Sequence, residues 1–74
     1  MKKYTFDLLH NTIPEFRERD HVIPAQSLTD AIRKFTLKHD LEAPAYWDEP
    51  FFETFMEISF TGSGGTVRYR IHWQ

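Results

Sequence analysis

Apolar and polar residues alternate with a period of two from Phe52 to Trp73, on both sides of a short glycine-rich segment. Alternation of this kind is typical of half-buried antiparallel strands. The apolar positions are Phe52, Met56, Ile58 and Phe60 in the first half, and Val67, Tyr69, Ile71 and Trp73 in the second. Between the halves, Gly62-Ser63-Gly64-Gly65 supplies residues that accept the positive φ of a tight turn. We therefore predict a β-hairpin over residues 52–73.

The even length of the glycine segment determines which residues of this hairpin face each other. If Thr61 pairs with Thr66, the apolar side chains of both strands gather on one face. The cross-strand pairs on that face are Phe60 with Val67, Ile58 with Tyr69, and Met56 with Ile71. The opposite face then carries an ion pair, Glu57 with Arg70, and an aromatic–imidazole pair, Phe55 with His72.

Two further strands are predicted before the hairpin. Residues 3–9 alternate between apolar and polar side chains, and Pro14 ends the pattern because proline cannot donate to a strand ladder. The charged residues 15–20 fit either a loop or the first half of a returning strand. We predict a short second strand over Arg19–Ile23, which Pro24 confines to a sheet edge.

A single helix is predicted to begin after Ser27. Ser27 is an N-cap residue, and Asp30 takes the place of the glutamate of a capping box. The helical period places Leu28, Ala31, Ile32 and Phe35 on one apolar stripe. Leu37 points away from that stripe, so we expect it to be exposed.

These elements combine into one α+β domain that covers residues 1–74. We predict two layers, an antiparallel sheet of three to four strands with one helix packed on one face. The expected core comprises Tyr4, Phe6, Leu8, Leu28, Ile32, Phe35, Met56, Ile58, Tyr69 and Ile71.

The net charge of −2 is unevenly distributed along the chain. Residues 1–39 carry seven basic and five acidic residues, whereas residues 40–74 carry two basic and six acidic ones. The acidic band of residues 40–57 either steers a basic partner or simply keeps the surface soluble. The chain has no cysteine, signal-peptide pattern or membrane-length apolar run, so we expect a cytoplasmic protein with no membrane contact.

No arrangement of catalytic or metal-binding residues stands out. His10, His21, His39 and His72 lack the spacing of a metal site, and the glycines lie in a hairpin turn rather than between a strand and a helix. One helix on a thin sheet leaves little room for a pocket that perturbs the pKa of an acid. We therefore expect a non-enzymatic protein without cofactor or metal.

The candidate partner-binding residues fall into two groups. One is the acidic aromatic segment between the helix and the hairpin, and the other is the uncovered face of the sheet. Trp47 has a structural alternative, as a cap on the end of the core. The full candidate set is Tyr46, Trp47, Asp48, Glu49, Glu53, Phe55, Glu57, Arg68, Arg70 and His72.

The order of elements, with the helix start Ala25-Gln26-Ser27-Leu28-Thr29-Asp30-Ala31, resembles that of small phage and mobile-element proteins. In outline it is similar to the β-β-α-β-β anti-CRISPR inhibitors. The resemblance implies a stoichiometric inhibitor in the host-cell cytosol that occupies a surface of a CRISPR effector complex, where nucleic acid would bind. It assigns no role to any individual residue.

Three functional hypotheses follow from these observations. The first is a protein-binding inhibitor of a host defence nuclease. The second is a small nucleic-acid-binding module that uses Phe55, Arg68, Arg70 and His72 on the open face, although Glu53, Glu57 and the net negative charge count against it. The third is an accessory domain that associates with its own copy, so that the protein is a monomer or a homodimer.

Overall fold

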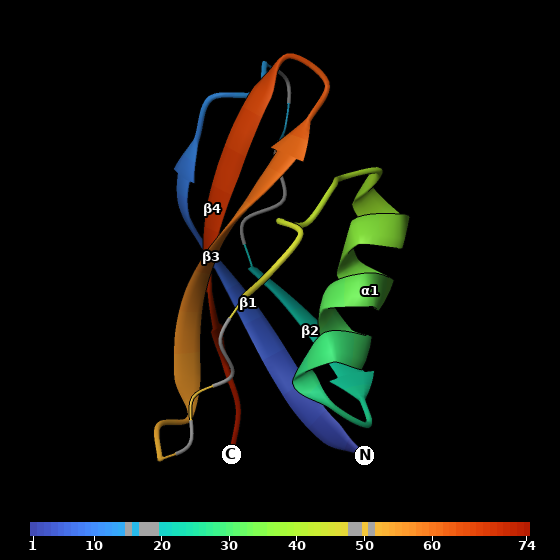
Figure 1. Ribbon diagram of the computed structural model, residues 1–74, viewed down its shortest axis with the longest axis vertical. Helices are drawn as coiled ribbons and strands as arrows, with labels where there is room; N and C mark the ends of the chain where they lie inside the picture. The colour runs from blue at the N-terminus through green and yellow to red at the C-terminus, as the bar shows by residue number, and fades with distance from the viewer. Residues whose placement is uncertain (15, 17–19, 48–49, 51) are drawn as a thin grey trace.

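The computed structural model of the 74-residue chain describes residues 1–14, 16, 20–47, 50 and 52–74. The elements are β1 (Lys2–Asn11), β2 (Asp20–Ala25), α1 (Leu28–His39), β3 (Phe55–Gly62) and β4 (Gly65–His72). The four strands form one antiparallel sheet in the order β2-β1-β4-β3. Helix α1 packs on one face of this sheet, so the predicted two-layer α+β fold is confirmed (Figure 1).

The hairpin register agrees with the sequence prediction at every pair. Thr61 pairs with Thr66, Ile58 with Tyr69, and Glu57 with Arg70. Gly62 and Gly65 close the hairpin around Ser63 and Gly64, and Gly64 has a φ of 89°. Glycine accepts this left-handed conformation without the steric cost that a Cβ atom would bring.

The start of β3 differs from the prediction. The strand begins at Phe55 rather than Phe52, and Phe52 is 98% exposed. The alternation of apolar residues continues to Phe52, but Phe52 lies beyond the point where backbone pairing with β4 ends. The last bond at this end runs from the Trp73 amide to the Thr54 carbonyl, at 2.9 Å.

Strand β2 exists but lies slightly later than predicted. It covers Asp20–Ala25 rather than Arg19–Ile23, and Arg19 lies outside the described residues. Pro24 is inside the strand and pairs with Lys3. Because β2 is an edge strand, the missing amide of Pro24 costs no ladder bond.

Helix α1 begins and ends with identifiable caps. The Ser27 hydroxyl accepts a hydrogen bond from the Asp30 amide at 3.1 Å, and the Asp30 carboxylate accepts one from the Gln26 amide at 3.2 Å. At the other end, Asp40 adopts a left-handed conformation with φ 54° and ψ 49°. Leu37 is 77% exposed, as its position on the helical wheel predicts.

The core lies between α1 and the sheet and is rich in aromatic rings. Phe35 stacks on Phe6 with ring centroids 4.2 Å apart, and its edge contacts the Tyr69 ring at 4.9 Å. Of the ten predicted core residues, eight are buried, while Leu8 and Met56 are half-buried against the core. The buried set also includes Ile23, Ala25, Ala31, Leu41, Phe60 and Val67.

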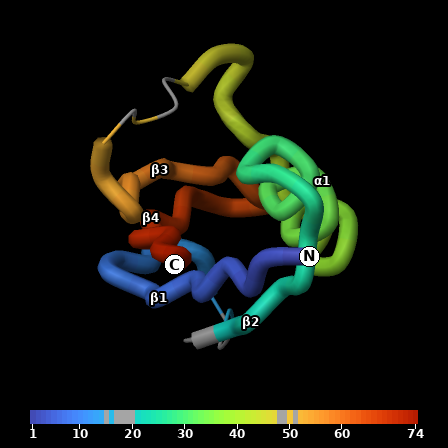
Figure 2. The backbone as a smooth tube through the Cα atoms, turned by 90° about the horizontal axis from the view of Figure 1, so that it is seen from below, coloured from blue at the N-terminus to red at the C-terminus, as the bar shows by residue number. Residues whose placement is uncertain are grey.

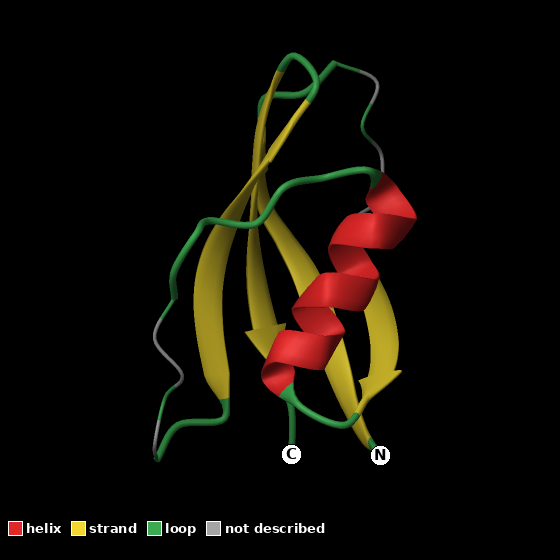
Figure 3. Cartoon of the chain, turned by 45° about the vertical axis from the view of Figure 1, so that its right-hand side comes forward, coloured by secondary structure: helices red, strands yellow, loops and turns green. Residues whose placement is uncertain are grey.

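The helix covers only part of the apolar face. Helix α1 lies over the β1–β2 side, and the described residues 40–47 of the connection that follows it lie on the β3 side of the sheet (Figures 2 and 3). Leu41 of this connection is buried, and Ala43 and Trp47 pack against the core. The Glu42 and Thr61 backbones exchange two hydrogen bonds, which fasten the connection to β3.

Candidate functional site: the open face of the sheet

The face of the sheet opposite α1 gathers half of the candidate residues. Phe55 and Glu57 on β3, and Arg68, Arg70 and His72 on β4, alternate with buried residues and are exposed. The turn closes at Gly62–Gly65, so the pairs Phe55–His72 and Glu57–Arg70 occupy non-hydrogen-bonded positions of the ladder. Side chains at such positions lie closer together than at hydrogen-bonded ones. The hairpin geometry therefore brings these groups into contact.

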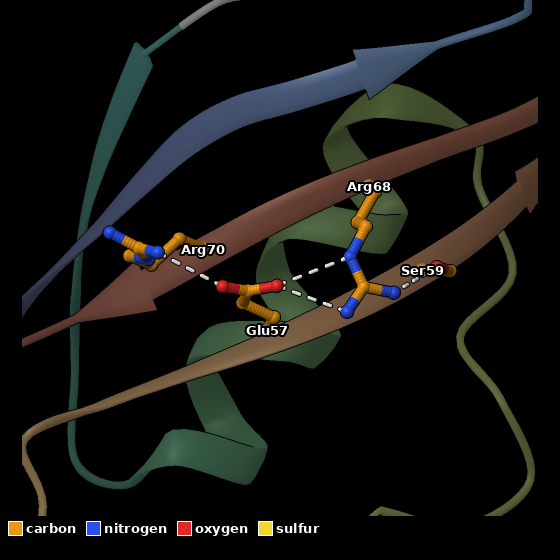
Figure 4. A network of polar contacts seen from close by, with 4 residues as sticks. All are labelled: Glu57, Ser59, Arg68 and Arg70. Carbon is orange, nitrogen blue, oxygen red and sulfur yellow. Dashed lines mark hydrogen bonds and ion pairs between the residues drawn. The ribbon is translucent and has the colours of Figure 1, made fainter.

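Glu57 is the centre of a polar network on this face (Figure 4). Its Oε1 accepts hydrogen bonds from Arg68 Nη2 at 3.0 Å and Nε at 3.3 Å, and its Oε2 accepts one from Arg70 Nη2 at 3.0 Å. Arg68 Nη1 also donates to the Ser59 hydroxyl at 3.3 Å. Two guanidinium groups thus share one carboxylate, and the cluster keeps a surplus positive charge.

The two arginines also change the acidity of Glu57. Hydrogen bonds from Arg70 and then Arg68 stabilise the ionised carboxylate and lower the pKa of Glu57 below its ordinary value of 4.5. Glu57 therefore stays charged at neutral pH. The ion pairs of Glu57 with Arg68 and Arg70 form on a solvent-exposed surface rather than in the core.

Phe55 extends this network into an aromatic contact. The Arg70 guanidinium carbon lies 5.6 Å from the centre of the Phe55 ring, within the range of a cation–π interaction. Phe55 itself is 45% exposed. Aromatic residues and arginine are enriched at protein interfaces, so this pair is a candidate contact.

His72 belongs to a second contact on the same face. Its Nε2 lies 2.8 Å from Asp7 Oδ2, on the neighbouring strand β1. Asp7 is not among the candidate residues of the sequence analysis. Only the pairing of β1 with β4 brings the two residues together.

The aromatic residues of the connection do not join this face. Tyr46 is 77% exposed, and Trp47 is half-buried against the core. Both line a shallow depression with Thr29 of α1, on the helix side of the sheet. The placement of Trp47 agrees with its structural interpretation as a cap on the core. Asp48 and Glu49 lie outside the described residues.

Glu53 lies beside a surface cavity of about 440 Å³ at the end of the sheet near the start of α1. Its lining includes Lys2, Ser27, Phe52 and Trp73. Among the described residues of the lining, Lys2 and Glu53 are the charged ones.

The acids of residues 40–57 do not form one patch in the described structure. Asp40 and Glu42 lie near the hairpin turn, beside Gly62. Glu53 lies at the opposite end of β3, and Glu57 is held by two arginines between them. The described acids of this segment therefore do not form a continuous acidic surface.

Lys34 and Lys38 of α1 both contact neighbouring groups. Lys34 Nζ lies 3.3 Å from Asp30 and donates to the Pro24 carbonyl at 3.0 Å. Lys38 Nζ contacts His21 Nε2 at 2.9 Å. These contacts tie the exposed side of α1 to strand β2.

Within the described part of the chain, no three His, Asp or Glu side chains are arranged to hold a metal ion. In the same residues no helix has the length and apolar character needed to cross a membrane.

Comparisons with protein families, curated proteins and solved structures found no match for this chain. The resemblance to β-β-α-β-β anti-CRISPR inhibitors therefore stays a prediction. The functional argument therefore rests on the exposed aromatic and charged groups of the open face.

Proposed function

We propose that this protein is a non-enzymatic binding protein that contacts another protein through the open face of its sheet. The observation that carries the proposal is the preordered cluster of Phe55, Glu57, Arg68 and Arg70. Its side chains are fixed by mutual contacts before any partner arrives. Fixed side chains lose less conformational entropy on binding than free ones.

In its specific form, the proposal is an inhibitor that blocks a host defence nuclease complex, as the resemblance to anti-CRISPR proteins implies. Such an inhibitor needs no catalytic group of its own, only a rigid surface that competes for a site on its target. A strand-rich, single-domain chain with an exposed Arg and aromatic cluster suits that task, because arginine and aromatic residues dominate protein interfaces.

The rival proposal is a module that binds single-stranded nucleic acid on the same face. Arg68 directs Nε and Nη2 to Glu57 and Nη1 to Ser59, so three of its N–H groups are engaged within the protein. The Phe55 ring contacts the Arg70 guanidinium, which competes with a stacking base. These contacts favour a protein partner over nucleic acid.

The test is a pull-down from host-cell lysate with tagged protein, run with and without nuclease treatment. We expect a protein to be recovered in both samples, and Phe55→Ala to weaken its binding by roughly tenfold or more. Leu37→Ala is the matched control, because Leu37 is an exposed apolar residue on the opposite layer. Equal binding by both variants would exclude the open face as the contact surface.

The inhibitor form is tested with a purified CRISPR effector complex and its target DNA. We expect stoichiometric protein to reduce cleavage, and the Phe55→Ala variant to reduce it less. Recovery of a partner only without nuclease, with affinity that falls steeply with salt and is lost in Arg68→Ala plus Arg70→Ala, would support the nucleic-acid module instead.

A further inference from the structure

Arg68 and Arg70 both lie on the open face of β4, but their guanidinium groups are engaged to different degrees (Figure 4). All three nitrogens of Arg68 donate hydrogen bonds, two of them to Glu57 and one to Ser59. Arg70 donates from Nη2 alone, to Glu57 at 3.0 Å. Within the described part of the chain, the Nε and Nη1 groups of Arg70 therefore have no hydrogen-bond acceptor.

Arg70 is nevertheless held in one place. Glu57 contacts it from β3, and the centre of the Phe55 ring lies 5.6 Å from its guanidinium carbon. The Arg70 side chain is 47% exposed. A fixed and half-exposed guanidinium suits a ligand, because little side-chain entropy is lost when an acceptor binds its remaining N–H groups.

The residues opposite Arg70 on the two neighbouring strands are both acidic. Asp7 pairs with it on β1, and Glu57 pairs with it on β3. The Asp7 carboxylate contacts His72, at 2.8 Å from its Nε2, so the described structure leaves Arg70 with one carboxylate partner. The positive charge of Arg70 is thus confined to one point with an acid on each side.

This arrangement discriminates between kinds of anion. A nucleic-acid strand carries a phosphate at every nucleotide, so binding of its backbone requires several basic side chains along its path. Asp7 and Glu57 repel phosphates on both sides of Arg70. A carboxylate on a protein side chain brings a single negative charge, and arginine binds carboxylates through charge-assisted hydrogen bonds. The open face therefore favours one acidic side chain over a polyanion.

We propose that the protein partner contacts the open face with an aspartate or glutamate side chain, whose carboxylate accepts hydrogen bonds from Arg70. An apolar side chain of the same partner segment packs on Phe55, which is 45% exposed and adjoins the Arg70 guanidinium. The inference rests on the proposed function, because it requires a protein partner on this face. A partner without the acid leaves the Arg70 N–H groups unsatisfied once water is excluded, which is unfavourable.

Arg68 provides a matched control for Arg70. Arg70→Gln and Arg68→Gln each remove one arginine from β4 and one ion pair with Glu57. The probe is the protein recovered in the lysate pull-down, after purification. We expect Arg70→Gln to weaken its binding by roughly tenfold or more, and Arg68→Gln to weaken it by less than about threefold. Thermal unfolding checks that both variants fold, and equal losses of affinity would overturn the assignment to Arg70.

Carbodiimide cross-linking detects the carboxylate directly, because it joins a lysine amine to a carboxylate in contact with it. Arg70→Lys places an amine at this position and keeps the positive charge. We expect mass spectrometry to identify a cross-link from this amine to an aspartate or glutamate of the recovered protein. Lys38, on helix α1 in the opposite layer, is the internal control and should form none. A cross-link to Glu57 alone, with the partner bound, would overturn the proposal.

Phe55→Ala and Arg70→Gln together separate the acidic contact from the open face itself. A partner that is lost on Phe55→Ala but binds Arg70→Gln as tightly as the unaltered protein would retain the proposed function and reject the acidic contact. A partner that binds both variants unchanged would reject both proposals. So would recovery of single-stranded nucleic acid instead of a protein, with affinity that falls steeply with salt.

Discussion

At the scale of single residues, Glu57 forms one more ion pair than its position in the sequence predicts. The hairpin register predicts its pairing with Arg70, and that pairing is confirmed. Arg68 reaches Glu57 as well, from the diagonal position on β4, which is within reach of a long side chain. The carboxylate is thus the shared acceptor of two arginines.

This arrangement predicts a pH-dependent contribution of Glu57 to stability. Its pKa is lower in the folded protein than its ordinary value of 4.5. The stabilisation is therefore fully present above pH 4.5 and is lost as the pH falls through the lowered folded pKa. We expect Glu57→Gln to reduce the melting temperature at pH 7, and the difference from the unaltered protein to shrink below pH 4.

The measurement is thermal unfolding of both proteins across this pH range. Comparing the two proteins at each pH removes the contribution of other carboxylates that titrate there. A difference between them that is the same at pH 7 and pH 3 would contradict the assigned role of the ion pairs.

At the scale of the elements, the N-terminus of α1 has a favourable cap, whereas its C-terminus contains a strained residue. Ser27 satisfies the Asp30 amide, and Asp30 adds a favourable negative charge at the N-terminus. At the C-terminus, the Leu41 amide donates to the Thr36 carbonyl at 2.9 Å, as in a Schellman motif, in which Asp40 takes the left-handed position. Glycine normally fills that position, because a Cβ atom is strained there.

Asp40→Gly is therefore expected to stabilise the protein, by roughly 0.5 kcal/mol. The substitution relieves the left-handed strain and removes a negative charge from the helix end where a positive one is favoured. Asp40→Ala also removes the charge but keeps a Cβ atom, so it separates the two effects. Chemical denaturation measures both, and a stability of Asp40→Gly no higher than that of Asp40→Ala would exclude strain as the cause.

At the scale of the whole molecule, stability depends on a small aromatic core. Phe35 is fully buried and contacts the rings of Phe6, Phe60 and Tyr69. It connects the helix to strands β1, β3 and β4 at once. A domain of 74 residues has a total stability of roughly 4–11 kcal/mol, so one such residue represents a large fraction of it.

Phe35→Ala is expected to cost about 3–5 kcal/mol and to leave much of the protein unfolded at room temperature. Phe35→Leu keeps most of the volume and is expected to remain folded with a lower melting temperature. Circular dichroism distinguishes the two outcomes. A Phe35→Ala variant that unfolds cooperatively near the unaltered melting temperature would show that the core is larger than the packing indicates.

The sequence alone determined the local and pairwise features of this protein. Alternation and the glycine turn determine the β3–β4 register, because slipping by one residue would expose one strand's apolar side chains. Ser27 and the apolar stripe likewise determine where α1 begins and which side it buries. In each case the interacting residues are close along the chain or linked by a short turn.

Only the tertiary structure decided the relations between distant segments. The insertion of β1 between β2 and β4 brings Asp7 to His72, residues that no local pattern connects. It also makes β2 and β3 the edges, and packing separates Tyr46 and Trp47 on the helix side from Phe55 on the open face. Long-range pairing depends on burying all the apolar faces together, and a period read along one segment contains no information about that choice.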